Sequence, residues 1–304
     1  MINFHKSSVI KGARIRSSIL FILVPFVFHP AISAQQKDKK DAPPQQQLLA
    51  LTRTNARHEV RRFPYGSSLT IVGAPAGSIT IEAWPKSEID ITADVELHAN
   101  TEADLSLLAA VNTFTVDEDA NHLRILTTGT HDKIFMRRVA KKFPKILLNL
   151  PWKIDFHIRV PPLCDIEIDA GRGAITLAGV EGALSLKALE SNANLTLTGG
   201  AVNATIGAGS VQVNLATRSW RGAGASIQLA LGDMTVELPP GFNADINADV
   251  LRTGQIENGY EALVPQERTS LTPRSIHGRA GAGGATLSFT VTDGTLRIKK
   301  RSEK

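Results

Sequence analysis

"GRGAITLAGVEGALSLKALESNANLTLTGG", residues 171–200, is the stretch of sequence that decides the fold. After nearly every glycine comes a short run in which apolar and polar residues alternate, as in Ala183–Ala188. Alternation with a period of two predicts a strand with one buried face, and glycine predicts a tight corner between strands. The stretch therefore predicts thin layers of β-structure stacked one on the next.

These glycines do not form a phosphate-binding loop. Such a loop needs backbone N–H groups at the start of a helix, in patterns such as G-x-x-x-x-G-K-[ST] or G-x-G-x-x-G. Gly171-Arg172-Gly173 has the first two glycines of the second pattern but runs into a strand, and "GAGG" from Gly281 does the same. We therefore expect no nucleotide cofactor and assign the glycines to the architecture.

The same strand pattern extends over most of the chain. "GSITIEAW" from Gly77 and "EIDITADVEL" from Glu88 alternate in the same way, and from Ile154 onward short runs recur about every 7 to 11 positions. One segment is helical in its spacing instead, with Thr101 as the expected N-cap and Leu105 on the apolar side. We expect an all-β, Gly-rich fold with one short helix inserted.

A longer repeat relates two parts of the chain. "VPPLCDIEIDA" from Val160 and "LPPGFNADINA" from Leu238 match at an offset of 78 residues, and a three-residue shift then aligns Gly173 with Gly254. The second segment looks like a degenerate copy of the first. The repeat predicts a β-solenoid-like stack made of two related halves.

No residue pattern indicates nucleophilic or metal chemistry. Cys164 is the only cysteine, which excludes an intramolecular disulfide, and it takes the place of Phe242 in the repeat, which predicts a buried thiol. The histidines show neither i,i+4 nor H-E-x-x-H spacing, and no serine lies in a G-x-S-x-G elbow. We expect no catalytic residue, no cofactor and no metal site.

Acidic residues on two strands are the candidates for an alternative function. The first strand carries Asp165, Glu167 and Asp169. The copy carries the acids Asp245 and Asp249 and the amide residues Asn243 and Asn247. If the two strands stack, these side chains form a ladder that could bind Ca²⁺ or act on a polysaccharide, as paired carboxylates do in glycosidases. The other interpretation is a solvated strand face. The calcium-loop template itself is not met, because Val250 stands where that template requires glycine.

The amino-terminal residues indicate export. Residues 1–34 combine four basic residues, an apolar run of 10 residues (Ile19–Phe28) and a small-residue end at Ser33 and Ala34, near which we expect cleavage. The run is shorter than the roughly 20 residues that span a bilayer, although an uncleaved anchor is the alternative. Residues 35–50 are polar and predict a disordered linker. We expect a periplasmic, envelope or secreted protein that is not an integral membrane protein after cleavage.

Positive charge is concentrated in one segment. The chain carries a net charge of +5, and loss of the four basic residues of the signal peptide leaves +1, so the charge does not indicate a nucleic-acid partner. Residues 131–160, by contrast, hold eight Lys and Arg against two Asp. Phe135, Val139 and Phe143 recur there at i, i+4 and i+8.

The cations of this segment are the candidate binding residues: Arg137, Arg138, Lys141, Lys142 and Lys145. They lie away from the apolar stripe, which makes the segment basic and amphipathic. Such a segment binds an anionic membrane surface or an acidic glycopolymer. A helix or loop that only solvates its cations is the alternative.

Four stretches together resemble a known family. They are "GSITIEAWPKSEIDITADVE" from Gly77, "RVPPLCDIEIDAGRGAITLAGVEGALSLKA" from Arg159, "GDMTVELPPGF" from Gly232 and "GAGGATLSFTVTDGTLRIKKR" from Gly281. This pattern resembles the putative-adhesin family of bacterial envelope proteins, a domain of unknown function. The resemblance implies a β-solenoid-like repeat fold, an exported or envelope-facing location and no established enzymatic activity.

These features combine into one expected organisation. We expect a signal peptide (1–34), a linker (35–50), a β part with the short helix and the basic insertion (51–153), and an adhesin-like β-repeat domain (154–304). The expected function is that of a non-catalytic envelope or secreted protein that presents a binding surface to an anionic lipid, a glycopolymer or a protein. The alternative is a carbohydrate-active enzyme that uses the acidic ladder.

Overall fold

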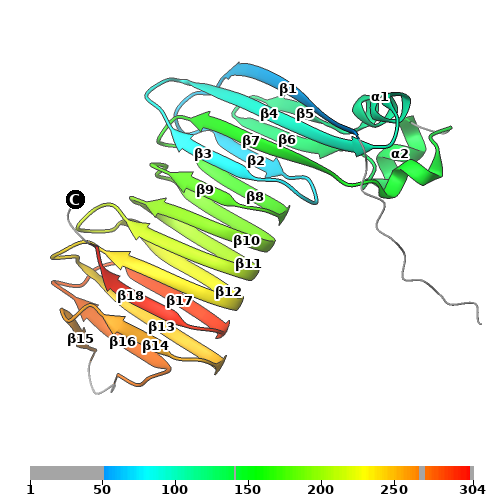
Figure 1. Ribbon diagram of the computed structural model, residues 1–304. Coiled ribbons are helices and arrows are strands. Elements are labelled where there is room, and N and C mark those ends of the chain that lie inside the picture. Colours follow the sequence, from blue (N-terminus) through cyan, green and yellow to red (C-terminus); the bar gives the residue numbers. More distant parts are fainter. Residues whose placement is uncertain (1–50, 140–141, 267–270, 302–304) are drawn as a thin grey trace, which may run out of the picture. The chain divides into compact units, whose positions relative to one another are not determined.

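Strands dominate the computed structural model, which describes residues 51–139, 142–266 and 271–301 (Figure 1). The fold is therefore all-β, as the sequence predicts. The expected signal peptide and linker, residues 1–34 and 35–50, lie outside the described residues, and so does Lys141.

The strands pair into two ladders. The first ladder runs, neighbour by neighbour, through β5 (Thr113–Asp119), β6 (His122–Thr128), β2 (Ser68–Val72), β8 (Asp165–Arg172), the first halves of β10 (Ala183–Leu197), β11 (Gly199–Leu215) and β12 (Arg221–Leu238), then β17 (Thr286–Asp293), β13 (Ala244–Thr253), β16 (Ser275–Ala280) and β15 (Leu263–Pro265). Pairing is parallel from β6 to β13 and antiparallel at both ends.

A layer is one turn of the chain, such as β11, whose first half lies in the first ladder and whose second half lies in the second. The second ladder is formed by these second halves and the strands that correspond to them. It runs through β1 (Leu51–Arg62), β4 (Glu88–Ala99), β7 (Trp152–Val160), β3 (Ile79–Ala83), β9 (Ile175–Ala178), the second halves of β10, β11 and β12, then β18 (Leu296–Lys300) and β14 (Ile256–Gly259). Pairing is antiparallel from β1 to β7 and parallel from there to β14. The expected boundary between residues 153 and 154 falls within β7.

Glycine allows most layers to pass from the first ladder to the second. In β12 the corner is Gly232, with φ +130, where a Cβ atom would lie 1.8 Å from the carbonyl oxygen of Gly209 in β11. Only glycine fits there, because the obstacle is backbone and the positive φ disfavours other residues. The same close approach recurs along a column formed by Gly77, Gly173, Gly209, Gly232, Gly294 and Gly254, whereas the corner of β10 is Ser191, whose carbonyl oxygen lies against Gly209.

The core lies between the two ladders. In β11, Val202, Ala204 and Ile206 of the first half and Val211, Val213 and Leu215 of the second half are all buried, whereas the residues between them are partly or fully exposed. Each layer therefore contributes about six small or medium apolar side chains to the core. This composition accounts for the low aromatic content of the chain, 5%.

The two copies of the repeat occupy corresponding places. Each begins with a proline pair and enters a strand of the first ladder, β8 or β13. Cys164 and Phe242 are both buried, and Gly173 and Gly254 both lie in the corner column. Burial raises the pKa of the Cys164 thiol to about 12, so it stays protonated at neutral pH. The prediction of a buried thiol is confirmed.

The structure contains a second helix besides the expected one. The expected helix, α1 (Glu102–Val111), is capped by Thr101, whose hydroxyl accepts a hydrogen bond from the Asp104 backbone N–H at 3.1 Å. Between β6 and β7 lie a further helix, α2 (Lys133–Val139), and a 3₁₀ helix, η1 (Lys145–Asn149). Figure 1 shows α1 and α2 at the same end of strands β4 to β7. The prediction of one helix was thus wrong in number.

A buried carboxylate joins three strands of the second ladder. Asp90 of β4 lies 2.9 Å from His58 Nε2 of β1 and 2.5 Å from Arg159 Nη2 of β7, and its side chain is only 8% exposed. Burial raises the pKa of the Asp90 carboxyl, but the hydrogen bonds from His58 and Arg159 outweigh it and hold the pKa below its ordinary value of 3.8. The Arg159 guanidinium also stacks over Trp84, 4.6 Å from the ring centroid.

The glycine column predicts a position-dependent cost of adding one methyl group. Gly232→Ala should lower the free energy of unfolding by about 3 kcal/mol or more, because its Cβ meets backbone that cannot move aside. Gly241→Ala is the matched control: its φ is +67, but nothing lies within 4 Å of the added atom, so we expect a loss of only about 1 kcal/mol. Urea unfolding of both variants measures the difference. Equal losses would show that close approach at the corner does not matter.

The Asp90 contacts predict a pH dependence of stability. Because the folded-state pKa is lowered, the ionised carboxylate stabilises the fold above the unfolded value near 3.8, and this contribution disappears as the pH falls through the folded-state pKa. Asp90→Asn should therefore lower the free energy of unfolding by about 1 kcal/mol at pH 7, and the difference from the unmodified protein should shrink below pH 3.8.

Urea unfolding at a series of pH values measures this difference. Asp94→Asn on the same strand, where the side chain is exposed, is the control and should change little at any pH. A difference for Asp90→Asn that is as large at pH 3 as at pH 7 would contradict the assigned role of the ionised carboxylate.

Candidate functional site

Residues 129–151 connect β6 to β7, and we call this segment the excursion. It begins at Gly129, which is tightly packed. A Cβ atom on Gly129 would lie 2.3 Å from Asn112 Oδ1 and 2.7 Å from the Trp152 ring, so only glycine fits between them. The buried Asn112 side chain accepts a hydrogen bond from the Thr130 backbone N–H at 2.9 Å. These contacts hold the beginning of the excursion against the end of α1 and the start of β7.

Asp132 determines where α2 begins. Its Oδ1 accepts hydrogen bonds from the backbone N–H groups of Ile134 at 2.8 Å and Phe135 at 3.0 Å, which caps the helix. The hydrogen bond from Phe135 is the main reason why the pKa of the Asp132 carboxyl lies below its ordinary value. The helix docks through Met136, which is buried. The single acid of the excursion is therefore used in capping.

A cavity of about 800 Å³ opens beside α2 and η1. Its apolar lining comes from Met136, Phe143 and Leu148. Its charged lining comes from Lys133, Arg137 and Lys145, all of which are exposed. We call it the α2–η1 cavity. It combines a hydrophobic interior with three cations at its border, a combination suited to a molecule that is apolar at one end and anionic at the other.

Two isoleucines project into solvent next to these cations. Ile134, which follows Lys133, is 70% exposed, and Ile146, which follows Lys145, is 81% exposed. Each short helix packs through a different apolar side chain that is buried, Met136 in α2 and Leu147 in η1. The two exposed side chains are therefore not needed for docking the helices, and each directly follows a cation of the α2–η1 cavity in the sequence.

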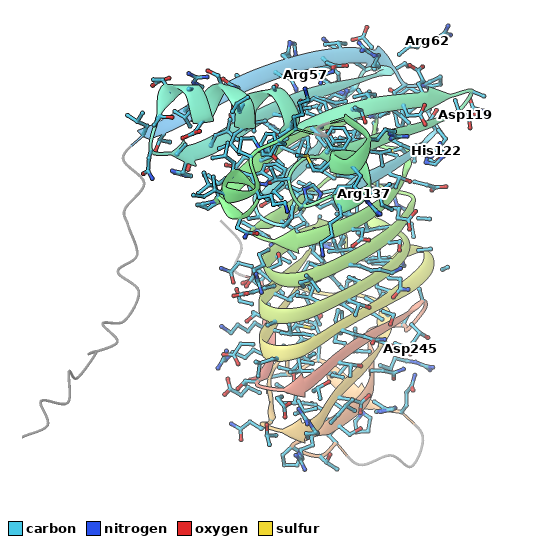
Figure 2. The ribbon with its side chains drawn as sticks, turned by 90° about the vertical axis from the view of Figure 1, so that its right-hand side faces the viewer. Arg57, Arg62, Asp119, His122, Arg137 and Asp245 are labelled. Atoms are coloured by element: carbon cyan, nitrogen blue, oxygen red, sulfur yellow. The ribbon has the colours of Figure 1, made fainter. Side chains whose placement is uncertain are left out.

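The candidate cations of the basic segment are distributed over α2, the turn after it and η1. Arg137 (labelled in Figure 2) and Arg138 are exposed on α2, Lys142 is exposed after it, and Lys145 begins η1. α2 ends at Val139, and Phe143, which stands immediately before Pro144, lies outside the helix and packs against the core.

The excursion carries unneutralised positive charge. Among the described residues, none of Lys133, Arg137, Arg138, Lys142 and Lys145 forms an ion pair. Sequence reasoning included Lys133 in the charge count but not among the candidate binding residues, and it missed Ile134 and Ile146. The available signal was an isoleucine directly after a lysine, outside the apolar stripe, at both places.

The acids of the two repeat copies do not meet. β8 and β13 are separated along the first ladder by β10, β11, β12 and β17, so Glu167 and Asn247 belong to one row with four residues between them. Five strand spacings of about 4.8 Å put the two sets about 24 Å apart. The acidic ladder that the enzyme alternative requires is not formed.

The copy-two acids instead contact basic and hydroxyl groups of β16. Asp245 (labelled in Figure 2) accepts a hydrogen bond from Arg279 at 2.9 Å, and Asp249 accepts one from the Ser275 hydroxyl at 2.7 Å. Over residues 51–139, 142–266 and 271–301, no three His, Cys, Asp or Glu side chains gather closely enough to hold a metal ion. No helix in the same ranges is long and apolar enough to cross a membrane.

Comparison with known proteins finds similar structures but no similar sequence. The sequence matches no protein-family model and no curated protein. A putative cell adhesion protein from Clostridium sporogenes superposes with a TM-score of 0.42 at 12% identity, covering 81% of this chain and 100% of its own. A putative adhesin from Bacteroides fragilis gives 0.28 at 12%, covering 81% and 97%.

A third solved structure, a putative lipid binding protein from Parabacteroides distasonis, gives a TM-score of 0.23 at 11% identity and covers 82% of this chain and 97% of its own. Two of these three bacterial proteins are thus described as adhesion proteins.

Proposed function

We propose that this chain is an exported, non-catalytic binding protein that attaches to anionic lipid surfaces through α2 and η1. The observation that carries the proposal is the pair of exposed isoleucines, Ile134 and Ile146, each next to a cation of the α2–η1 cavity. An anionic bilayer offers both partners that these side chains lack: an apolar interior for the isoleucines and phosphate groups for the cations.

Charge and apolar burial contribute comparable free energies to such binding. Each Lys or Arg near an anionic membrane surface contributes about 1 kcal/mol, so the five described cations of the excursion contribute about 5 kcal/mol. Burial of two isoleucines contributes up to about 3–6 kcal/mol. Neither contribution alone offsets the lost freedom of the protein by a wide margin. We therefore expect binding to need both anionic lipid and low to moderate salt.

The rest of the chain acts as a scaffold in this proposal. The layered strands form a β-solenoid-like stack of two related halves, which holds the excursion at one end of β6 and β7. Within residues 1–34, the four basic residues near the amino terminus and the apolar run Ile19–Phe28 support export to the periplasm, the envelope or the medium. The separation of the acids of β8 and β13 leaves the enzyme alternative without its carboxylate ladder.

Vesicle sedimentation tests the proposal. The full chain is mixed with vesicles of phosphatidylcholine alone or with 30 mol% phosphatidylglycerol added, at low and physiological salt. Lys133→Gln/Arg137→Gln/Lys145→Gln should weaken binding to the anionic vesicles by roughly a hundredfold, because three charge contributions are removed. Ile134→Ser/Ile146→Ser should weaken it by roughly tenfold or more, because the inserted apolar surface is lost.

A matched control removes exposed apolar side chains elsewhere. Leu189 and Leu231 are 68% and 59% exposed at the layer corners, so Leu189→Ser/Leu231→Ser makes the same chemical change far from the excursion along the chain. It should leave vesicle binding unchanged. Equal binding to neutral and anionic vesicles, or equal losses in the control and the Ile134/Ile146 variant, would overturn the proposal.

A further inference from the structure

A second large cavity lies on the outer side of the second ladder. It has a volume of about 970 Å³ and lies over the carboxyl-terminal halves of β10, β11, β12 and β18. Thr196, Asn214, Glu237 and Lys299 form one row across it, since they pair in register from strand to strand. Three strand spacings make this row about 14 Å long. The cavity is large enough for several linked sugar units.

The walls of this cavity are held in place by hydrogen bonds. Tyr260 Oη donates to the carbonyl oxygen of Pro239 at 3.2 Å, which fixes the proline wall. On the other side, Arg301 donates from Nη1 to the carbonyl oxygen of Leu215 at 2.9 Å, and its backbone N–H donates to Leu238. The carbonyl oxygen of Arg218 accepts a hydrogen bond from the Asn243 backbone N–H at 2.8 Å. These hydrogen bonds fix the backbone that forms the walls of the cavity.

Positive charge is gathered in the cavity without matching negative charge. Arg218, Lys299, Lys300 and Arg301 line it, and Glu237 is its one acid among the described lining residues. Within the described part of the chain, the side chains of Arg218, Lys299 and Lys300 form no ion pair. An anionic ligand would supply the ion-pair partners that these side chains do not have among the described residues.

The polar row across the cavity offers hydrogen-bond partners for the hydroxyl groups of a ligand. The Asn214 amide donates to Asn194 Oδ1 at 2.9 Å and accepts from Gln212 at 3.2 Å, so the amides of neighbouring layers are aligned. Glu237 lies in the middle of the row and can only accept hydrogen bonds when ionised. A simple anion placed beside Glu237 would be repelled, whereas a sugar hydroxyl would donate to it.

We propose that this cavity binds an acidic oligosaccharide, with its carboxylates at Arg218, Lys299 and Lys300 and its hydroxyls along Thr196, Asn214 and Glu237. The binding site is separate from the α2–η1 cavity in both residues and ligand chemistry. It gives the chain a second means of attachment, to a carbohydrate polymer, that does not depend on the proposed lipid binding.

Calorimetric titration of the full chain with a galacturonic acid hexamer tests this site. The fully methyl-esterified hexamer has the same size without the charges, and inorganic phosphate serves as the simple anion. At physiological salt the acidic hexamer should bind, and the ester should bind at least about tenfold more weakly. Arg218→Gln/Lys299→Gln should lower the affinity for the acidic hexamer by about tenfold or more.

Two neutral substitutions at one residue isolate the hydroxyl contact. Glu237→Gln keeps a hydrogen-bond acceptor, whereas Glu237→Leu removes it, and both remove the charge. We expect the Glu237→Gln variant to bind the hexamer severalfold more tightly than the Glu237→Leu variant. If both variants bind equally, the sugar hydroxyls do not contact this residue and the proposal fails.

The remaining variants identify what a negative result would mean. Lys187→Gln/Arg274→Gln removes two exposed cations elsewhere and should leave the affinity unchanged, as should the Lys133/Arg137/Lys145 variant of the α2–η1 cavity. Full competition by millimolar phosphate would reduce the cavity to a simple anion site and overturn the proposal. Equal binding of the ester and the acid, or an unchanged affinity in Arg218→Gln/Lys299→Gln, would overturn it as well.

Discussion

A contact between backbone atoms at the corner of each layer is the constraint on which the rest of the structure depends. Gly232 lies against the carbonyl oxygen of Gly209, and Gly294 lies against that of Gly232. At these glycines an added Cβ atom would point directly at the backbone of the neighbouring corner, so none fits there. The corners therefore align, and the strands on both sides keep one register from layer to layer. Because the register is shared, the inward residues fall into rows and fill a thin core without large rings.

Both proposed sites lie where this regular pattern is interrupted. Within a layer, inward side chains are needed for the core and outward side chains form flat rows, so neither makes a cavity. Between β6 and β7 the chain leaves the layers to form α2 and η1, and at the ends of β11 and β12 it turns at Ala216–Arg218 and Pro239–Pro240. The residues of these segments form the sides of the two cavities, which the strands alone would not enclose. The strands that flank each of these segments hold its two ends in place.

Local patterns in the sequence predicted the elements that depend on near neighbours. Alternation identified the strands, and the α1 cap at Thr101 followed from residue spacing. The burial of Cys164 followed from its match to Phe242. The second helix was not counted because the spacing of Phe135, Val139 and Phe143 left this segment open between a helix and a loop, and α2 has only seven residues. The exposure of Ile134 and Ile146 was missed because an apolar residue in a short helix is normally the one that docks it.

The sequence by itself determined the all-β class, the glycine corners and the concentration of positive charge between β6 and β7, because each depends on residues that are adjacent or regularly spaced along the chain. Only the tertiary structure decided which polar residues meet. It separated the acids of β8 and β13 by four intervening strands and brought Thr196, Asn214, Glu237 and Lys299 into one row. The physical reason is that register between layers is set by backbone contacts at the corners, which connect residues far apart in sequence.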